Sequence, residues 1–190
     1  VALTEALWKE IYPYLEQDLP LAEPPEAMET VKALWSGREL PCAPGEAESP
    51  VMAEVSGRTY VFREPNEPGL KWARFTFSGG GEGLLEYENA TGAQELRFGL
   101  GRQVYGALSQ TQYYGRRIGT PKGSGYPCAA SAGWVMPGQL HIVCYALDEH
   151  FGTLAMDFTF EDGCLTYCGR NYAEWFFGEF WGFAGGEEKR

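Results

Sequence analysis

Hydrophobic and polar side chains alternate with a period of two from about residue 55 onward, which is the pattern of half-buried β-strands. Ala73, Phe75 and Phe77, for example, alternate with Arg74 and Thr76. Each run ends at a cluster of glycine, proline, asparagine or aspartate residues, as tight hairpin turns require. The pattern therefore predicts short strands that follow one another in an antiparallel meander.

We expect about eight to ten such strands, because each alternating run has the usual length of a strand. They are expected near residues 58–64, 70–78, 82–89, 93–99, 127–136, 139–147, 151–161, 164–169 and 174–183, with one more near 110–116. A closed sheet leaves no unpaired edge strand, so we predict a mainly β fold, an antiparallel up-and-down β-barrel of the lipocalin-like kind. A two-sheet sandwich is the alternative.

Two short helices are predicted before the barrel. Leucine or isoleucine recurs every fourth residue from Leu3 to Leu15, and Pro13 ends or kinks this helix near Tyr12. A second helix is expected to begin at Pro24 and Pro25, because proline suits a first helical turn. We therefore divide the chain into a tail helix of an upstream domain (1–17), a linker with a short helix (18–55), the barrel (56–184) and a charged tail (185–190).

Composition and charge narrow the classes of partner. The chain has 190 residues, 44% of them hydrophobic and 15% aromatic, which is enough for one globular domain with a core. Its formal net charge of −11 disfavours nucleic acid and anionic membrane surfaces, which both attract clustered lysine and arginine. No apolar run approaches the ~20 residues of a membrane-spanning helix.

The cysteines bear on the cellular location of the protein, and the start of the chain bears on whether it is a fragment. Five cysteines leave at least one unpaired, and Cys164 and Cys168 on one strand would lie roughly 13 Å apart, too far for a disulfide. Free thiols weakly favour a cytoplasmic location. The chain starts at Val1 without an initiator Met or a signal-peptide pattern, so we expect a fragment cut from the C-terminal end of a larger bacterial protein.

Chemical motifs are sparse. The chain has two histidines, and His141 within an apolar strand is expected to be structural. Cys164 and Cys168 lack a second pair of zinc ligands, and the glycines at 79–83 lack the lysine and helix of a phosphate-binding loop. We therefore assign no catalytic residue, no cofactor and no metal ligand.

The aromatic residues near the C-terminus are the most unusual feature, with six aromatic side chains in residues 175–183. We expect a closing strand that buries Phe177 and Trp181 in the barrel. An aromatic wall of a cavity or an interface with another domain is the functional interpretation. The residues assigned to this candidate cavity or interface are Trp134, Trp175, Phe177, Phe180 and Trp181.

Several strand and turn motifs resemble a known family. Residues 56–62, with the sequence Ser-Gly-Arg-Thr-Tyr-Val-Phe, are similar to the strand that opens the C-terminal domain of bacterial β-lactamase-related, class-C-like and penicillin-binding-protein-like serine hydrolases. Further similar motifs are residues 96–101, 129–134, 158–163 and 176–180 followed by Gly182. Residues 1–49 resemble the junction between the catalytic domain of that family and this domain.

This resemblance implies a non-catalytic accessory barrel that packs on or near the upstream catalytic domain of the same chain. The family's Ser-x-x-Lys nucleophile motif is absent, because no serine of this chain has a lysine at the third following position. The alternative is a free-standing lipocalin-like protein that binds a small apolar ligand inside the barrel. An enzyme that uses a carboxylate with one histidine is the third hypothesis.

Overall fold

The computed structural model describes residues 2–10, 12, 25–108, 112–113, 116–117, 126–147, 152–172 and 178–189. The chain forms two compact units, Val1–Leu40 and Pro41–Arg190.

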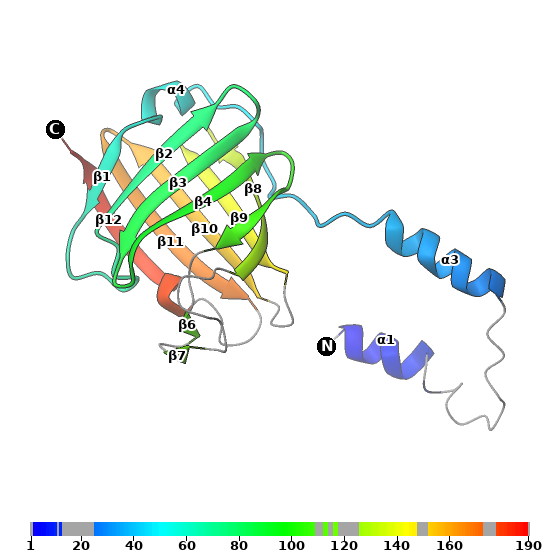
Figure 1. Cartoon of the computed structure of the whole chain (residues 1–190). Helices are drawn as coiled ribbons and strands as arrows, with labels where there is room; N and C mark the ends of the chain where they lie inside the picture. The colour runs from blue at the N-terminus through cyan, green and yellow to red at the C-terminus, as the bar shows by residue number, and fades with distance from the viewer. Residues whose placement is uncertain are drawn as a thin grey trace. The chain divides into compact units, whose positions relative to one another are not determined.

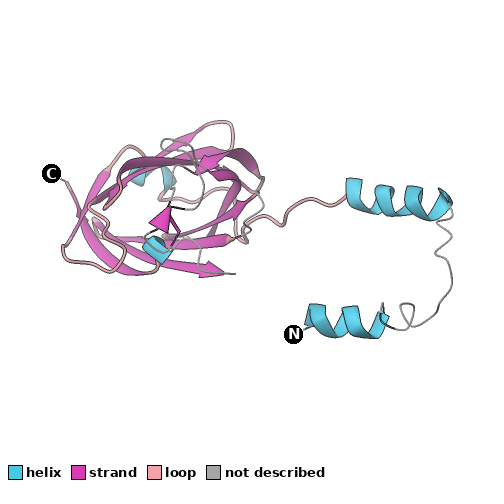
Figure 2. Ribbon diagram, turned by 60° about the horizontal axis from the view of Figure 1, so that its bottom comes forward, coloured by secondary structure: helices cyan, strands magenta, loops and turns pink. Residues whose placement is uncertain are grey.

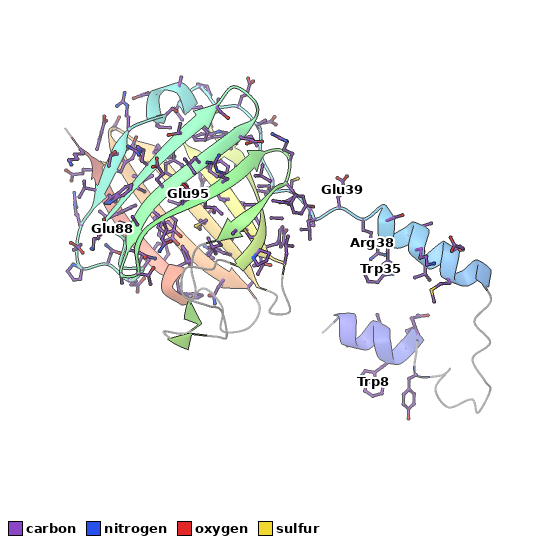
Figure 3. All side chains as sticks on the ribbon, viewed as in Figure 1. Trp8, Trp35, Arg38, Glu39, Glu88 and Glu95 are labelled. Atoms are coloured by element: carbon purple, nitrogen blue, oxygen red, sulfur yellow. The ribbon has the colours of Figure 1, made fainter. Side chains whose placement is uncertain are left out.

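The first unit contains α1 (Ala2–Glu10) and α3 (Pro25–Ser36) (Figure 1). Proline stands at the first position of α3 and Gly37 follows its last residue, as the sequence pattern predicts. Large apolar side chains of both helices are exposed, including Trp8 and Trp35, which are labelled in Figure 3. Among the described residues, no helix is long and apolar enough to cross a membrane.

The second unit is built around one ten-stranded sheet (Figure 1). Its strands are β1 (Thr59–Phe62), β2 (Trp72–Ser78), β3 (Glu82–Asn89), β4 (Gly92–Leu100), β5 (Val104–Leu108), β8 (Tyr126–Met136), β9 (Gln139–Ala146), β10 (Thr153–Glu161), β11 (Cys164–Tyr172) and β12 (Gly182–Glu188). The short strands β6 (Gln112–Tyr113) and β7 (Arg116–Arg117) pair with each other. Helix α4 (Met52–Val55) precedes β1, and the 3₁₀ turn η1 (Gly178–Phe180) precedes β12.

The sheet closes on itself into a barrel. Each strand pairs antiparallel with its neighbour in the order β4-β3-β2-β1-β12-β11-β10-β9-β8-β5. In this order β1 and β12, the first and last strands along the chain, lie side by side. A short parallel pairing of β4 with β8, at Gly99 opposite Ser131 and Leu100 opposite Ala132, completes the ring. Figure 2 shows this ring from its end. The predicted antiparallel, lipocalin-like barrel is confirmed, and the sandwich alternative is wrong.

The closing strand lies later in the chain than its aromatic pattern indicates. The aromatic residues predict it near 174–183, but the closing strand β12 begins at Gly182 and is rich in glycine and glutamate. Its inward positions are Gly182, Ala184 and Gly186, and a side chain at Gly186 would meet the Val61 carbonyl and the Phe62 ring. The inward-facing residues of β12 are therefore small rather than large and hydrophobic. Strand β5 was not predicted either.

Aromatic rings fill the middle of the barrel. The Phe75 ring lies 4.8 Å from that of Phe158 and 5.3 Å from that of Phe160, both in edge-on contacts. Trp134 and Phe77 extend this cluster, with ring centroids 5.7 Å apart. Edge-on pairs of this kind stabilise a core beyond the area that they bury. The space between the ribbons in Figure 2 is thus occupied by side chains.

Ion pairs between neighbouring strands lie on the outside. The Arg74 guanidinium donates two hydrogen bonds, of 2.8 and 2.7 Å, to the Glu86 carboxylate opposite it. Glu88, labelled in Figure 3, accepts hydrogen bonds from Lys71 at 2.7 Å and from the Trp72 indole at 2.9 Å. These pairs favour the observed register of β2 and β3, because a shift by one residue would separate them.

Residues 41–46 pack against the outer face of β8. The Ala43 amide donates to the Ser131 hydroxyl at 2.8 Å, and Glu46 and Trp134 exchange two backbone hydrogen bonds of 3.0 and 2.8 Å. The backbone of Pro44 passes so close to Gly133 that a Cβ atom at that position would collide with the Pro44 carbonyl. Gly133 therefore permits this contact.

We predict that Gly133→Ala lowers the free energy of unfolding by about 1–3 kcal/mol, because the added methyl group forces residues 41–46 away from β8. Urea unfolding monitored by circular dichroism measures the change. Gly106→Ala on β5 is the matched control, since nothing lies within 4 Å of its added Cβ atom. Equal stability of the two variants would contradict the role given to Gly133.

The Arg74 pair also predicts a pH effect. Hydrogen bonding to Arg74 lowers the pKa of Glu86 from its ordinary value of 4.5. The stabilisation is therefore fully present above the unfolded-state pKa and is lost as the pH falls through the lower folded-state pKa. Glu86→Gln should be less stable than the natural chain at pH 7, and this difference should shrink with acidification. A difference that persists unchanged to pH 2 would show that packing, not ionisation, is responsible.

Candidate functional site

A small apolar cavity lies inside one end of the barrel. Its walls come from strands β2, β3, β10 and β11, from the segment that leads into β2 and from η1: Leu70, Ala73, Leu85, Tyr87, Met156, Phe158, Tyr167 and Phe180. The cavity volume is about 10 Å³, which is roughly the space that one water molecule needs. The alternation of the strands places these side chains on the inner face, and the closure of the sheet brings them together.

Phe180 closes the cavity from outside the sheet. It is 2% exposed, although it belongs to the three-residue turn η1 and not to a strand. The Tyr167 hydroxyl donates a hydrogen bond of 2.7 Å to the Phe180 carbonyl, and the rings of Tyr87 and Phe180 lie 5.9 Å apart. Gly169 makes room for this turn, because a Cβ atom there would overlap both the Phe180 carbonyl and the Tyr167 hydroxyl. Tyr167 and Gly169 thus hold Phe180 in the position in which it closes this end of the barrel.

The walls of the cavity are uncharged. Their polar groups are the phenolic hydroxyls of Tyr87 and Tyr167, and the remaining side chains are aliphatic, aromatic or the thioether of Met156. Such a surface stabilises apolar molecules by the area that they remove from water. An ionised group would lose its hydration here without gaining an opposite charge from these walls.

The predicted site residues lie in different environments. Phe180 lines the cavity, whereas Trp134 is buried near Phe77 and Phe160, away from the walls. Trp181 is 58% exposed, so its predicted burial is wrong: Phe180 faces inward and the next side chain points to solvent. Trp175 and Phe177 lie outside the described residues.

Seven of the wall residues were not singled out from the sequence. Leu85, Met156 and Tyr167, for example, are inward-facing residues of ordinary alternating strands. The alternation shows that they face inward, but it does not show at which end of the barrel they meet. That depends on the register of β3, β10 and β11, which the turns between the strands determine.

Two thiols face each other elsewhere in the interior. Cys128 on β8 and Cys144 on β9 are both buried, and all five cysteines are free. A hydrogen bond between the two sulfur atoms lowers the pKa of Cys128 and raises that of Cys144, which burial raises further.

A histidine and an aspartate form a pair on the outside of the barrel, where His141 Nδ1 lies 2.7 Å from Asp157 Oδ1. Within the described residues, no three acidic, histidine or cysteine side chains gather as a metal site would require.

No protein-family model and no curated protein matches the sequence. Solved structures with a similar fold are fatty-acid-binding proteins and a lipid-binding protein. One is the fatty-acid-binding protein from Manduca sexta, with a TM-score of 0.43 and 11% identity over 72% of this chain and 99% of that chain. Another is a Schistosoma mansoni fatty-acid-binding protein in complex with arachidonic acid, with a TM-score of 0.45 and 10% identity over 73% and 97% of the chains.

A third similar structure is apo lipid binding protein 8 of Caenorhabditis elegans, with a TM-score of 0.45 and 12% identity over 72% of this chain and 95% of that chain. The assignment to the β-lactamase-related serine hydrolases is therefore wrong, as is the role of accessory domain beside an upstream catalytic domain. No family model supports the hydrolase, and the solved structures of similar fold are fatty-acid-binding and lipid-binding proteins.

The motifs that carried the resemblance have a simpler origin. Gly57, with φ of 79°, turns the chain into β1, and the pair Asp162 and Gly163, with φ of 48° and 76°, makes the tight turn from β10 to β11. Glycine and aspartate at such positions follow from the backbone conformation, which recurs in antiparallel barrels in general. These motifs therefore indicate hairpins rather than descent.

Proposed function

We propose that the barrel binds a small apolar ligand in the cavity at its η1 end. The observation that carries this proposal is Phe180, whose ring closes an uncharged cavity from a turn that is not part of the sheet. A ligand that replaces the Phe180 ring gains an apolar chamber walled by four strands. The barrel keeps its strand pairing while this happens, because η1 contributes no ladder hydrogen bond to it.

The energies are of a size that allows this exchange. Displacing Phe180 costs about 1.5–3 kcal/mol for exposing its ring and about 0.5–1.5 kcal/mol for its hydrogen bond from Tyr167. A ligand that buries about 200 Å² of apolar surface gains about 5 kcal/mol. The two amounts nearly balance, so we expect weak binding by the natural chain and tighter binding once the Phe180 ring is removed.

Fluorescence titration with N-phenyl-1-naphthylamine, a neutral apolar probe that brightens when it leaves water, tests the proposal. We expect Phe180→Ala to bind the probe about tenfold or more tightly than the natural chain, because about 1.4 kcal/mol of displacement cost disappears. Trp181→Ala is the matched control. It removes a neighbouring large ring that is 58% exposed and should leave the affinity unchanged.

The location of the probe is tested by a second substitution. Met156→Trp fills the hollow from the β10 wall and should weaken binding to the Phe180→Ala variant. Equal affinities of the natural chain and the Phe180→Ala variant, or equal gains from Phe180→Ala and Trp181→Ala, would exclude the Phe180 end as the binding site. Circular dichroism spectra of each variant verify that the barrel is retained.

A further inference from the structure

A second hollow lies at the opposite end of the barrel, between α4 and the turn from β10 to β11. Its volume is about 270 Å³, close to the lower end of the range of about 300–1,000 Å³ for small-molecule pockets. The two ends are separated by the length of β12, which leads from η1 to Lys189 beside Thr59 at the start of β1. Figure 1 shows α4 at the upper end of the barrel.

The floor of this hollow is aromatic and aliphatic. Val55, Tyr60 and Phe160 are 4%, 2% and 8% exposed, and the rings of Tyr60 and Phe160 meet edge-on with centroids 5.6 Å apart. The Tyr60 hydroxyl makes no hydrogen bond within the described part of the chain, although its side chain is almost completely buried. Burial raises the pKa of Tyr60, so the hydroxyl stays neutral and can both donate and accept.

The rim of the hollow is acidic. Glu54, Glu161 and Asp162 stand around it, and the cation at the rim is Arg58. Arg58 is already held by Glu188, with a hydrogen bond of 2.6 Å, and lies 3.8 Å from Glu54. The side chains of Glu161 and Asp162 make no ion pair within the described residues. The rim therefore carries excess negative charge above an apolar floor.

We propose that this hollow binds a small protonated primary amine with an aromatic or short aliphatic body. The ammonium group has three donors, which match the rim carboxylates and the oxygen of Tyr60. The body of the ligand would cover Val55 and the ring of Phe160, and a cation beside the rings of Tyr60 and Phe160 gains further attraction. A negatively charged ligand would be repelled by the rim, and a neutral one would lose the ionic contribution.

Benzylammonium, benzyl alcohol and benzoate are the probes, since they share one ring and differ in charge. Heteronuclear NMR titration of the natural chain at low salt measures their affinities. We expect benzylammonium to bind about tenfold more tightly than benzyl alcohol, with the advantage falling at high salt, and benzoate not to bind. Equal affinities for benzylammonium and benzyl alcohol would overturn the proposal.

Substitutions locate the site. Tyr60→Phe should weaken benzylammonium binding severalfold while leaving the unfolding midpoint unchanged, because the lost hydroxyl has no hydrogen-bond partner among the residues that the structure describes. Asp162→Asn removes a rim charge and keeps a residue that tolerates the φ of 48°, and it should also weaken binding. Glu48→Gln removes an exposed carboxylate from outside the hollow and is the matched control. If Tyr60→Phe and Asp162→Asn changed the affinity for benzylammonium no more than Glu48→Gln does, the assignment would be contradicted.

Chemical blocking gives an independent readout. The exposed thiol of Cys164 lies on the rim, so a bulky maleimide adduct there should abolish benzylammonium binding. Cys164→Ser treated with the same reagent still carries an adduct on exposed Cys42 and should retain binding. Binding that survives the Cys164 adduct would place the amine elsewhere. N-Phenyl-1-naphthylamine binding by the Phe180→Ala variant should be unaffected by the adduct, which separates the two sites.

Discussion

The interior of a closed barrel has a fixed volume, and in this protein large aromatic side chains occupy most of it. Some of the rings that point inward therefore fit only because a glycine lies against them. Gly83 lies against the Phe98 ring, and Gly186 against Phe62. The constraint applies to β12 at Gly186, because a side chain there would collide with the Val61 carbonyl and the Phe62 ring. β12 thus completes the ring of ten strands while its inward positions, Gly182, Ala184 and Gly186, add little side-chain volume to the interior.

The same constraint places both candidate binding sites at the ends of the barrel. The cluster of Phe75, Phe158, Phe160 and Trp134 leaves no room for a ligand at the level that it occupies. At the η1 end the barrel is closed by the ring of Phe180, and at the α4 end by a floor in which the Tyr60 hydroxyl has no hydrogen-bond partner among the described residues. One end is uncharged and the other acidic, so the two sites would select ligands of different chemistry.

The sequence predicts most of the fold, and physical reasons explain where it fails. The run that predicts a strand at 82–89 matches β3 in full, because alternation and turn residues agree there. The sequence pattern does not predict β12 over its full length, because Phe183 is its one residue of the β-branched or aromatic kind by which strands are recognised. For the site, the sequence indicated the importance of Phe180 through the density of aromatic residues. It could not separate Phe180 from Trp181, because which of two neighbours faces inward depends on where the strand begins.

The contacts of residues 41–46 show that the folded barrel unit includes residues before its first strand. Ser131 and Gly133 on β8 are covered by this segment, which supplies a hydrogen-bond donor to one and a passing backbone to the other. A polypeptide started at residue 56, where alternation makes the barrel appear to start, would uncover both and would also lose the α4 wall of the acidic hollow. A polypeptide started at Pro41 would keep them. The smallest part of this chain that retains its full outer surface is therefore longer than its strands alone indicate.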